Sequence, residues 1–502
     1  MSPIDAVSYH ARRQPQAPAC VDLETGRRWQ YAGLDQDVDR VAAWIVARLG
    51  PASGARVACV ARNSVAMLIL HLAAVRAGAV FVPLNWRLTA RELGTLLADA
   101  GATLLLHDHE FEVRGFDGVS LDMTELASIV PPAVPFKRTP RGIDQPATLL
   151  YTSGTSGRPK GVVVTESSAF WGCTNFIFGN DLTRGSVMLC DMPMFHIAGL
   201  FAAVRSVLLV GGTVLISRGF DPQRTLERIA APALRVSHYF SVPQMAQALW
   251  NQENFRPDML RGLTVYCTGG APNSRAQVER FVRAGIRMSD GFGMSETGSN
   301  FGMPVHDPEL LVAKAGSCGI PYLTVQARIV DESGVDVAAD QVGELWLRGP
   351  SISPGYWNQP ELTREAFSDG WFKTGDAAKR DADGFYYIVD RRKDMYISGG
   401  ENVYPAEIEA VLGELESLCE AAVIGVPDER WGEVGCAYVV LKPGSRLDEE
   451  QVLTHCRQRL AGFKIPRTIV FGADIPRTAS GKILKTELRR RAAAGLGKHS
   501  TG

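Results

Sequence analysis

No stretch of this sequence is apolar for long enough to cross a membrane. The two longest apolar runs, around Ala66 to Leu84 and Ile197 to Ile216, are each interrupted by Arg and Gly. Such runs predict buried pieces in which a helix leads into a strand. The opening residues, MSPIDAVSYHARRQPQAP, also lack the apolar segment of a secretory signal. Together these absences predict a cytoplasmic protein without a membrane span.

Paired cysteines and an excess of charge of one sign are missing as well. Nine cysteines, an odd number, are scattered along the chain without a C-x-x-C pair. This usage suits a reducing compartment and favours neither a disulfide framework nor a zinc site. The formal net charge is only -1, so the composition does not indicate binding to nucleic acid or to an anionic membrane surface.

What the sequence does contain is an alternation of helical and strand patterns. From about Tyr31 to Leu106, helical periods alternate with short apolar strands such as ARVACV and AVFVPL. This rhythm predicts mostly parallel sheets flanked by helices, the α/β class. From Met303 to Asp390 the pattern becomes rich in strands, which predicts a small β unit. No internal repeat or low-complexity tract is present.

A compact α+β region is predicted at the end of the chain. After the charged run DRRKD, a helix is expected from about Pro405, followed by the strands AAVIGV and CAYVVL and by two helices. We therefore predict two domains, residues 1–390 and residues 391–502.

A cluster of small residues directly follows the predicted strand ATLLY. The run TSGTSGRPKG lets backbone N–H groups and hydroxyls converge on phosphate oxygens, and Lys160 adds a positive charge. It is not a Walker loop, because Pro159 stands where Gly must precede the Lys and Gly161 stands where Ser or Thr should bind magnesium. Ordinary P-loop kinases and GTPases are therefore disfavoured. A plain surface loop remains the alternative for this cluster taken alone.

The order YTSGTSGRPKG resembles the signature of the adenylate-forming superfamily, which includes acyl-CoA synthetases, adenylation domains of nonribosomal peptide synthetases and firefly luciferase. Further blocks of that family follow in its order over nearly the whole chain. They are DMPMFHIAGL, CTGGAP, DGFGMSETG, GELWLRGPSISPGYW, WFKTGD, DRRKDMYISGGENVYPAEIE and PRTASGKILK. The resemblance implies a large N-terminal domain with a small β-barrel-like unit, and a smaller mobile α+β C-terminal domain.

The resemblance implies a site for ATP and Mg²⁺. The residues implied in binding ATP or AMP are Thr152, Ser153, Gly154, Thr155, Ser156, Gly157, Lys160, Gly270, Ala271, Pro272, Asp290, Gly291, Phe292, Gly293, Met294, Ser295, Asp376, Arg391 and Lys482. Glu296, with Thr152, resembles the magnesium site. Asp376 resembles the acid that accepts both ribose hydroxyls, and Phe292 stands where the family most often has Tyr against the adenine.

Catalysis requires cations, because a carboxylate attacking the α-phosphate of ATP brings anion toward anion. By resemblance the catalytic residues are Lys482, Glu296, Lys160 and His196. Lys393 falls at the family's hinge, about which the terminal domain rotates between two poses. One pose places Lys482 over the adenylate; the other replaces it with a turn at Ser398, Gly399 and Gly400, which builds the channel for coenzyme A. The plainer alternatives are a helix-start acid for Glu296, a turn residue for Asp376 and exposed charges for Lys393 and Lys482.

By resemblance His196 lines the acyl pocket, and the neighbouring pocket candidates are small or apolar. The candidates are His196, Ala198, Gly199, Ala203, Cys267, Gly293 and Met294, which favour a hydrophobic acid. The stretch MFHIAG offers no Asp to pair an α-ammonium, so a free amino acid is disfavoured. Arg205 could receive a second carboxylate, although a structural role is the stronger interpretation. Fatty and aromatic acids are not separated.

We therefore predict an acid–thiol ligase that uses ATP, Mg²⁺ and coenzyme A. The nearest alternatives are an adenylating enzyme that loads a carrier protein and a non-catalytic regulator of the same fold. No carrier domain follows Lys482, which favours coenzyme A as the acceptor. A serine hydrolase is disfavoured because G-x-S-x-G is absent, and a dinucleotide fold because GFGMSE lacks the third glycine. Whether the protein forms a homodimer stays open.

Overall fold

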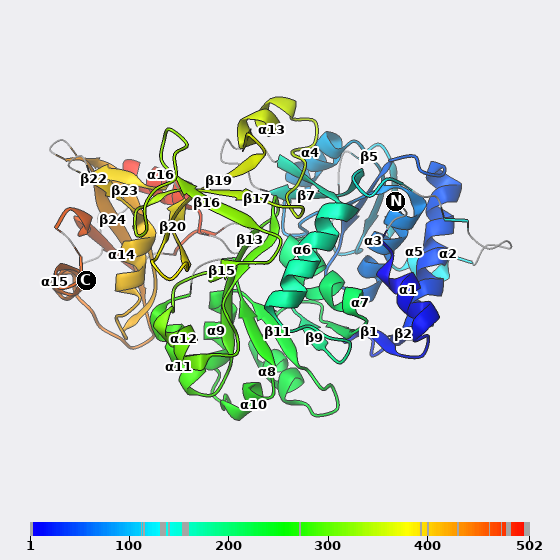
Figure 1. Ribbon diagram of the computed structural model, residues 1–502, viewed down its shortest axis with the longest axis horizontal. Coiled ribbons are helices and arrows are strands. Elements are labelled where there is room, and N and C mark those ends of the chain that lie inside the picture. Colours follow the sequence, from blue (N-terminus) through cyan, green and yellow to red (C-terminus); the bar gives the residue numbers. More distant parts are fainter. Residues whose placement is uncertain are drawn as a thin grey trace. The chain divides into compact units, whose positions relative to one another are not determined.

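The computed structural model describes most of the chain (Figure 1). The described residues are 4–111, 113, 116–130, 137–138, 141–152, 160–270, 273–391, 394–398, 401–428, 431–460, 462–472, 474–477 and 483–495. The chain divides into two compact units. The first comprises Met1–Ala327 and Leu347–Phe372, and the second comprises Arg328–Trp346 and Lys373–Gly502. This division rests on compactness, and the domain boundary predicted at residue 390 stays a prediction.

A six-stranded sheet in the first unit ends in the strand pair that carries the glycine-rich run. Its strands, in spatial order, are β6 (Val119–Asp122), β5 (Ala102–His107), β3 (Arg56–Val60), β4 (Val80–Pro83), β7 (Pro146–Thr152) and β8 (Lys160–Thr165). All neighbours pair in parallel except β7 and β8, which are antiparallel. The predicted strands ARVACV, AVFVPL and ATLLY are thereby confirmed.

A nine-stranded sheet forms the other layer of the first unit. Its order is β15 (Ile320–Pro321), β14 (Gly298–Gly302), β13 (Met288–Met294), β12 (Val265–Thr268), β11 (His238–Ser241), β9 (Val187–Cys190), β10 (Thr213–Ile216), β1 (Pro18–Asp22) and β2 (Arg28–Gln30). The six strands from β13 to β1 are parallel to one another. The predicted class, mostly parallel sheets flanked by helices, is confirmed.

The helices of the first unit fill the space between the sheets and cover their outer faces. They are α1 (Ala6–Arg13), α2 (Tyr31–Leu49), α3 (Val65–Ala77), α4 (Ala90–Ala100), α5 (Glu125–Ser128), α6 (Glu166–Gly179), the π-helix η1 (Ala198–Arg205), α7 (Ser206–Val210), α8 (Pro222–Ala230), α9 (Pro243–Trp250), α10 (Asp258–Arg261), α11 (Arg275–Arg283), α12 (Pro308–Ala313) and α13 (Pro360–Ala366). Local signals set their ends: Ser64 caps α3, and α3 stops at Gly78, whose φ of 70° suits glycine.

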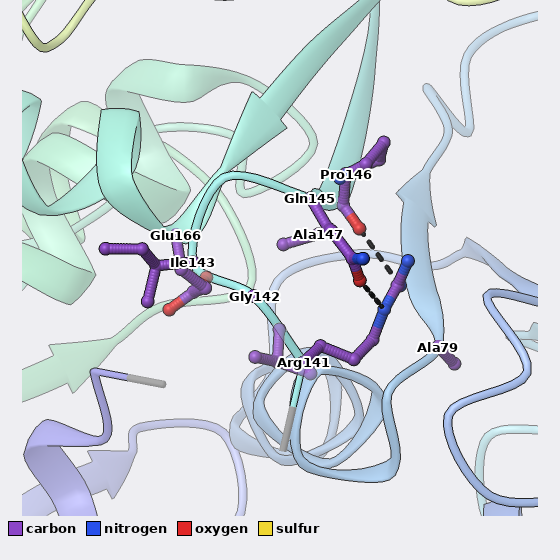
Figure 2. Close-up of a pocket in the computed structure, with 9 residues that line it drawn as sticks. Ala79, Arg141, Gly142, Ile143, Gln145, Pro146, Ala147 and Glu166 are labelled. Atoms are coloured by element: carbon purple, nitrogen blue, oxygen red, sulfur yellow. Dashed lines mark hydrogen bonds between the residues drawn. The ribbon is translucent and has the colours of Figure 1, made fainter. Parts of the chain in front are cut away.

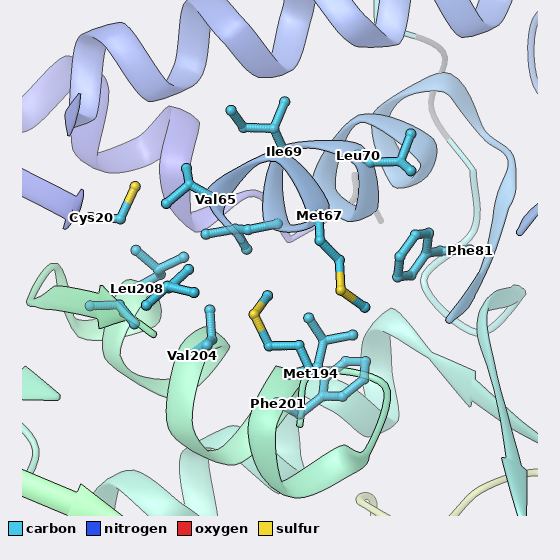
Figure 3. Close-up of a cluster of buried hydrophobic side chains, with 14 of the residues drawn as sticks. Cys20, Val65, Met67, Ile69, Leu70, Phe81, Met194, Phe201, Val204 and Leu208 are labelled. Atoms are coloured by element: carbon cyan, nitrogen blue, oxygen red, sulfur yellow. The ribbon is translucent and has the colours of Figure 1, made fainter. Parts of the chain in front are cut away.

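The largest core lies between the two sheets. Along β3 the burial alternates, since Val57 and Cys59 pack into this core while Ala58 and Val60 pack into a second cluster on the opposite face. Both faces of the sheet are therefore covered, as a parallel sheet requires. Helix α3 is buried nearly all round, and Figure 3 shows its Met67 lying close to side chains of the segment around η1. Both long apolar runs are confirmed as helix-then-strand pieces.

A smaller sheet and a terminal α+β region complete the chain. The small sheet comprises β16 (Gln326–Val330), β17 (Gly343–Arg348), β19 (Trp371–Arg380) and β18 (Phe367–Ser368), with β20 (Tyr386–Arg391) on β19. This confirms the strand-rich stretch before Asp390. The terminal sheet comprises β22 (Glu401–Val403), β21 (Tyr396–Ser398), β24 (Gly432–Leu441) and β23 (Leu418–Asp428), with β25 (Thr468–Phe471) on β24.

The terminal sheet of the second unit is covered by helices on both faces. The helices are α14 (Pro405–Leu412), α15 (Glu449–Arg457), the short 3-10 helix η2 (Gly462–Lys464) and α16 (Lys485–Ala493). Val423 and Val439 of the β23–β24 hairpin pack with α14 and α15, whereas Ile424 and Tyr438 pack with α16. The predicted helix at Pro405 and both predicted strands are confirmed, and β25 was missed. Within the described part of the chain, no helix is long and apolar enough to cross a membrane.

Candidate active site

The glycine-rich run joins two strands whose ends are fixed side by side. β7 and β8 pair with Thr152 opposite Lys160 and Tyr151 opposite Gly161. Directly opposite residues of an antiparallel pair direct their side chains to the same face. The Thr152 hydroxyl and the Lys160 ammonium therefore share one face of the hairpin. The run between them, which includes Ser153, Gly154, Thr155, Ser156 and Gly157, lies outside the described residues.

Tyr356 connects this hairpin to Glu296. Its backbone forms an antiparallel bridge with Val162 of β8. Its hydroxyl donates a hydrogen bond of 3.1 Å to Oε1 of Glu296, and the Nζ of Lys160 lies 5.5 Å from the centre of its ring. Burial, and then the neighbouring Glu296 carboxylate, raise the pKa of Tyr356 far above its ordinary value of 10.0, so the hydroxyl keeps its proton. The structure thus brings Lys160 and Glu296 to one ring.

Glu296 is placed by a tight turn between β13 and β14. The Met294 N–H donates to the Thr297 hydroxyl at 3.2 Å, and the Ser353 N–H donates to the Glu296 carbonyl at 2.7 Å. Gly298 follows with a φ of 69°, and a Cβ there would lie 3.2 Å from the Cα of Gly172 on α6. No helix begins at Glu296, so the helix-start interpretation of this acid is wrong. These contacts hold the backbone of the turn that carries the carboxylate.

The segments predicted to hold the adenine lie at the ends of neighbouring strands. Gly269 and Gly270 follow β12, and Phe292 lies on β13 with its ring 5.9 Å from that of Phe301. Gly270 has a φ of 83°, which favours glycine. A Cβ on Gly269 would lie 3.2 Å from the Gly291 carbonyl oxygen. Ala271 and Pro272 lie outside the described residues.

Asp290 lies beneath this turn and bonds the chain itself. Its Oδ1 accepts from the Thr268 hydroxyl at 3.1 Å, and its Oδ2 accepts from the Asn273 N–H at 3.1 Å. Burial raises its pKa to about 7. In this structure Asp290 therefore braces the turn from β12 into α11. Its predicted part in nucleotide binding stays a prediction.

The block DMPMFHIAGL runs into the π-helix η1, and the side chain of Asn63 forms hydrogen bonds with its backbone. Asn63 donates from Nδ2 to the Met192 carbonyl at 2.9 Å and accepts the Met194 N–H on Oδ1 at 2.8 Å. This amide fixes the backbone on both sides of Pro193. His196 follows, half-buried, with its ring 4.4 Å from that of Phe195. π-turns occur often at functional sites, which agrees with the predicted role of this block.

The predicted acyl-pocket residues differ in burial. His196, Ala198 and Met294 are half-buried and Gly293 is exposed, whereas Gly199, Ala203 and Cys267 are buried. The Cys267 thiol donates to Oδ1 of Asn180 at 2.9 Å, and burial raises its pKa far above 9.0, so it stays a neutral thiol. A shared role in holding the acid stays a prediction.

Arg205 is neutralised inside the protein. Its two terminal nitrogens donate to the two carboxylate oxygens of Glu166 at 2.6 and 2.7 Å; the Glu166 side chain is buried and that of Arg205 is 13% exposed. Such a bidentate pair uses the full planar fork of the guanidinium. The structural interpretation of Arg205 is thereby confirmed. The pair ties the end of η1 to the start of α6.

A small cavity next to Glu166 is not a substrate site. It is lined by Val75, Ala79, Arg141, Gly142, Ile143, Gln145, Pro146, Ala147 and Glu166. Figure 2 shows the Arg141 guanidinium bonded to Gln145 and to the Pro146 carbonyl, at 2.9 and 3.1 Å. The cavity volume of about 20 Å³ holds about one water molecule. Neither an acid nor a nucleotide fits there.

The second unit carries the remaining predicted residues. Asp376 on β19 is buried, its N–H donates to the Thr374 hydroxyl at 3.0 Å, and its backbone lies opposite that of Arg391 on β20. Ser398 is buried at the end of β21, opposite Glu401 and Gly432. Lys393, Gly399, Gly400 and Lys482 lie outside the described residues. The roles of these residues in ribose binding, hinge motion and catalysis stay predictions.

Residue-by-residue reasoning missed three positioning side chains. Tyr356 is the last residue but one of the block GPSISPGYW, and no charge marks it. Asn63 lies between β3 and α3 and belongs to no motif. Glu166 was the only acid near the start of α6, and a search for a carboxylate to match Arg205 would have found it. Tyr356 and Asn63 act through contacts between distant parts of the chain, which a search along the sequence does not show.

Comparison with known families and proteins gives full-length matches. The family described as AMP-binding enzyme matches residues 7–357, and the AMP-binding enzyme C-terminal domain matches residues 407–482. A feruloyl-CoA synthase from Amycolatopsis sp is 40% identical over 488 residues, which cover 96% of this chain and 97% of that protein. A 2-succinylbenzoate–CoA ligase from Geobacillus kaustophilus (strain HTA426) is 36% identical over 475 residues, covering 94% and 95%.

Solved structures match the fold over the same extent. The o-succinylbenzoate CoA synthetase MenE from Bacillus subtilis, in complex with its acyl-adenylate intermediate, has a TM-score of 0.88 at 29% identity and covers 97% of this chain and 98% of its own. ATP-bound MatB from Rhodopseudomonas palustris has a TM-score of 0.87 at 31% identity, covering 98% and 99%. A further MenE structure holds ATP and a magnesium ion.

Proposed function

This chain belongs to the AMP-binding enzyme family, and we propose that it joins an aromatic monocarboxylic acid to coenzyme A. It is an AMP-forming acyl-CoA synthetase. ATP and the acid give an acyl-adenylate and pyrophosphate, and the acyl group then passes to coenzyme A with release of AMP. The observation that carries the substrate class is the 40% identity with a feruloyl-CoA synthase over almost the whole of both chains.

The charge balance near η1 supports an acid with one carboxylate. A second carboxylate buried beside the pocket would need a cation, because an unpaired buried charge is very costly. Arg205, the cation on η1, already bonds both oxygens of Glu166. The half-buried members of the pocket, apart from His196, are apolar or small. A ring with few polar substituents therefore suits this lining better than a dicarboxylic acid.

The residues at the hairpin fit Mg²⁺ bound together with ATP. Among the residues that the structure describes, no group of three or more His, Cys, Asp or Glu gathers as a metal cage. Mg²⁺ needs no such cage, since it keeps several waters and binds through one or two carboxylates and the substrate's phosphates. Glu296 supplies such a carboxylate, and the Thr152 hydroxyl lies on the face that carries Lys160. When bound, the ion would neutralise phosphate charge.

The other predicted residues have distinct parts in this reaction. Lys160 and the run that precedes it contact the β- and γ-phosphates, and Asp376 accepts the ribose hydroxyls. Lys482 neutralises the substrate carboxylate and the α-phosphate while they react. Rotation at Lys393 then withdraws Lys482 and brings the turn of Ser398, Gly399 and Gly400 to line the channel for coenzyme A. His196 lines the acid, on a backbone that Asn63 holds in place.

A panel of acids tests the proposal. ATP–pyrophosphate exchange and mass spectrometry of the thioester would be measured with a hydroxycinnamate, a benzoate, an indole acetate, octanoate, palmitate and malonate. We expect the highest kcat/KM for an aromatic monocarboxylic acid and a value at least about a hundredfold lower for malonate. A preference for palmitate or malonate would overturn the substrate class. Adenylate formation without any acyl-CoA would instead favour loading of a carrier protein.

A further inference from the structure

Two oppositely charged side chains contact different parts of one tyrosine in the proposed ATP site. The Lys160 ammonium lies 5.5 Å from the centre of the Tyr356 ring, and the Tyr356 hydroxyl bonds Glu296 at 3.1 Å. No ion pair between Lys160 and Glu296 forms in the part of the chain that the structure describes. The ring is attractive to the cation on its face, while its hydroxyl satisfies the anion.

This separation matters because both side chains are long and flexible. Without the tyrosine that both contact, the ammonium and the carboxylate could form an ion pair and neutralise each other. In the proposed function Lys160 must meet phosphate and Glu296 must meet Mg²⁺. An internal ion pair would have to break before either could bind its ligand. Holding the two charges apart preserves both for the substrate.

Tyr356 itself is anchored from several directions, so it can hold other groups in place. Its backbone bridges Val162, and its N–H donates to the Thr363 hydroxyl at 3.0 Å. The next residue, Trp357, donates its N–H to the Gly161 carbonyl at 2.7 Å. Gly355 precedes it at a φ of 142°, and a Cβ there would lie 2.3 Å from Thr363. A residue fixed on both sides in this way keeps its ring where the backbone places it.

We propose that Tyr356 is a positioning residue which keeps Lys160 and Glu296 apart, so that the lysine stays available to phosphate and the carboxylate to the metal ion. The inference rests on the proposed function, because it takes the roles of Lys160 and Glu296 from it. The ring and the hydroxyl have separate parts. The ring is the spacer and holds the lysine at its face, and the hydroxyl fixes the orientation of the carboxylate.

Metal binding, rather than turnover, tests this inference. Mn²⁺ would serve as the probe, measured by electron paramagnetic resonance with saturating α,β-methylene-ATP. We expect Tyr356→Phe, which keeps the ring, to weaken Mn²⁺ binding by about threefold to tenfold, the loss of one hydrogen bond. Tyr356→Leu, which loses the spacer as well, should weaken it by about thirtyfold or more. Equal effects of the two variants would show that the ring has no spacing role.

A double variant identifies the cause. If Lys160 captures Glu296 when the ring is absent, Lys160→Met combined with Tyr356→Leu should bind Mn²⁺ more tightly than Tyr356→Leu alone, by about threefold or more. A double variant that binds no better than the single one overturns the proposal. Circular dichroism melting checks that each variant is folded. If Tyr356→Leu does not fold, unchanged Mn²⁺ affinity in Tyr356→Phe would still refute the hydroxyl's role.

Tyr151→Phe is the matched control in the same hairpin. Its hydroxyl also bonds a carboxylate, Oδ2 of Asp99, at 2.5 Å, but Asp99 has no proposed metal role. We expect Mn²⁺ affinity to be unchanged, and a loss equal to that of Tyr356→Phe would mean that any disturbance of the hairpin suffices, which refutes the proposal. A wild-type protein that binds neither the analogue nor Mn²⁺ refutes the proposed function as well. If only the acid panel fails, the ratios of Mn²⁺ affinity among the variants still decide whether Tyr356 has this role.

Discussion

Charged side chains are arranged in opposite ways in two regions of the first unit. The N-terminal ion cluster joins Asp5, Asp35 and Asp39 to Arg76 and Arg138. Arg76, whose side chain is only 4% exposed, contacts all three acids, with distances of 2.7 Å to Asp5 and 2.8 Å to Asp39. Arg138 bonds the same acids at the surface. At the β7–β8 hairpin, by contrast, Lys160 lies over the ring of Tyr356, and Glu296 accepts a hydrogen bond from the hydroxyl of the same tyrosine.

In the proposed function, the difference separates charges that hold the fold from charges that bind a ligand. In the ion cluster the partners come from α2, from α3 and from residues before α1, so their pairing joins segments that are far apart in sequence. Buried charges are tolerated there because they are paired and hydrogen-bonded. At the hairpin an internal pair would compete with phosphate and metal. We therefore expect substitutions in the cluster to change stability, and substitutions at the hairpin to change ligand binding.

The largest expected effect comes from a cation that belongs to neither region. Lys482→Ala should lower the rate of adenylate formation by about a thousandfold, since in the proposed function this lysine supplies the charge that meets the two reacting anions. The thioester step, started from a ready-made acyl-adenylate, should keep most of its rate because the second pose does not use this lysine. Single-turnover measurement of each half-reaction distinguishes the steps. Equal losses in both would refute the two-pose assignment.

A smaller effect, on stability alone, is expected in the ion cluster. Arg76→Met leaves three carboxylates without their central partner, and removing one member of a buried ionic group costs about 3 kcal/mol. Urea unfolding followed by tryptophan fluorescence should show this loss, while the KM for ATP should stay unchanged. Arg364→Met is the control, because that side chain is 77% exposed and its loss should alter neither quantity. An unchanged unfolding midpoint in Arg76→Met would break the contrast between the two regions.

The sequence predicted the strands and the charged residues of the hairpin region, because these depend on local patterns. Short apolar runs placed β3, β4 and β7, and the family motifs named Lys160 and Glu296. Tyr356 could not be assigned a role in this way, because it lies 60 residues from Glu296 in the sequence and meets it only through folding. The π-helix was equally hidden, since one extra residue per turn leaves an apolar run looking like an ordinary helix.

Arg205 shows how a partner distant in sequence decides between two interpretations. From the sequence it was either a receptor for a second carboxylate or a structural residue, and only the position of its neighbours separates these roles. Glu166, 39 residues earlier in the chain, bonds it at both terminal nitrogens. Local pattern identifies which residues can carry chemistry, whereas contacts between distant segments decide whether their charge is available to a substrate.

The smallest expected effect is a pH dependence within the ion cluster. Burial raises the pKa of Asp5, but the Arg76 guanidinium, the Ser8 N–H and Arg138 outweigh it and hold that pKa below its ordinary value of 3.8. A carboxyl with a lowered pKa stabilises the fold above its unfolded value and loses this contribution as the pH falls through its folded value. Asp5→Asn should therefore be less stable than the wild type at pH 7, with the difference shrinking below about pH 3.8. Urea unfolding of both proteins from pH 7 to pH 3 measures this difference. If the loss of unfolding free energy in Asp5→Asn is the same at every pH, Asp5 contributes by packing and not by its charge. The contrast between the ion cluster and the hairpin would then not rest on charge.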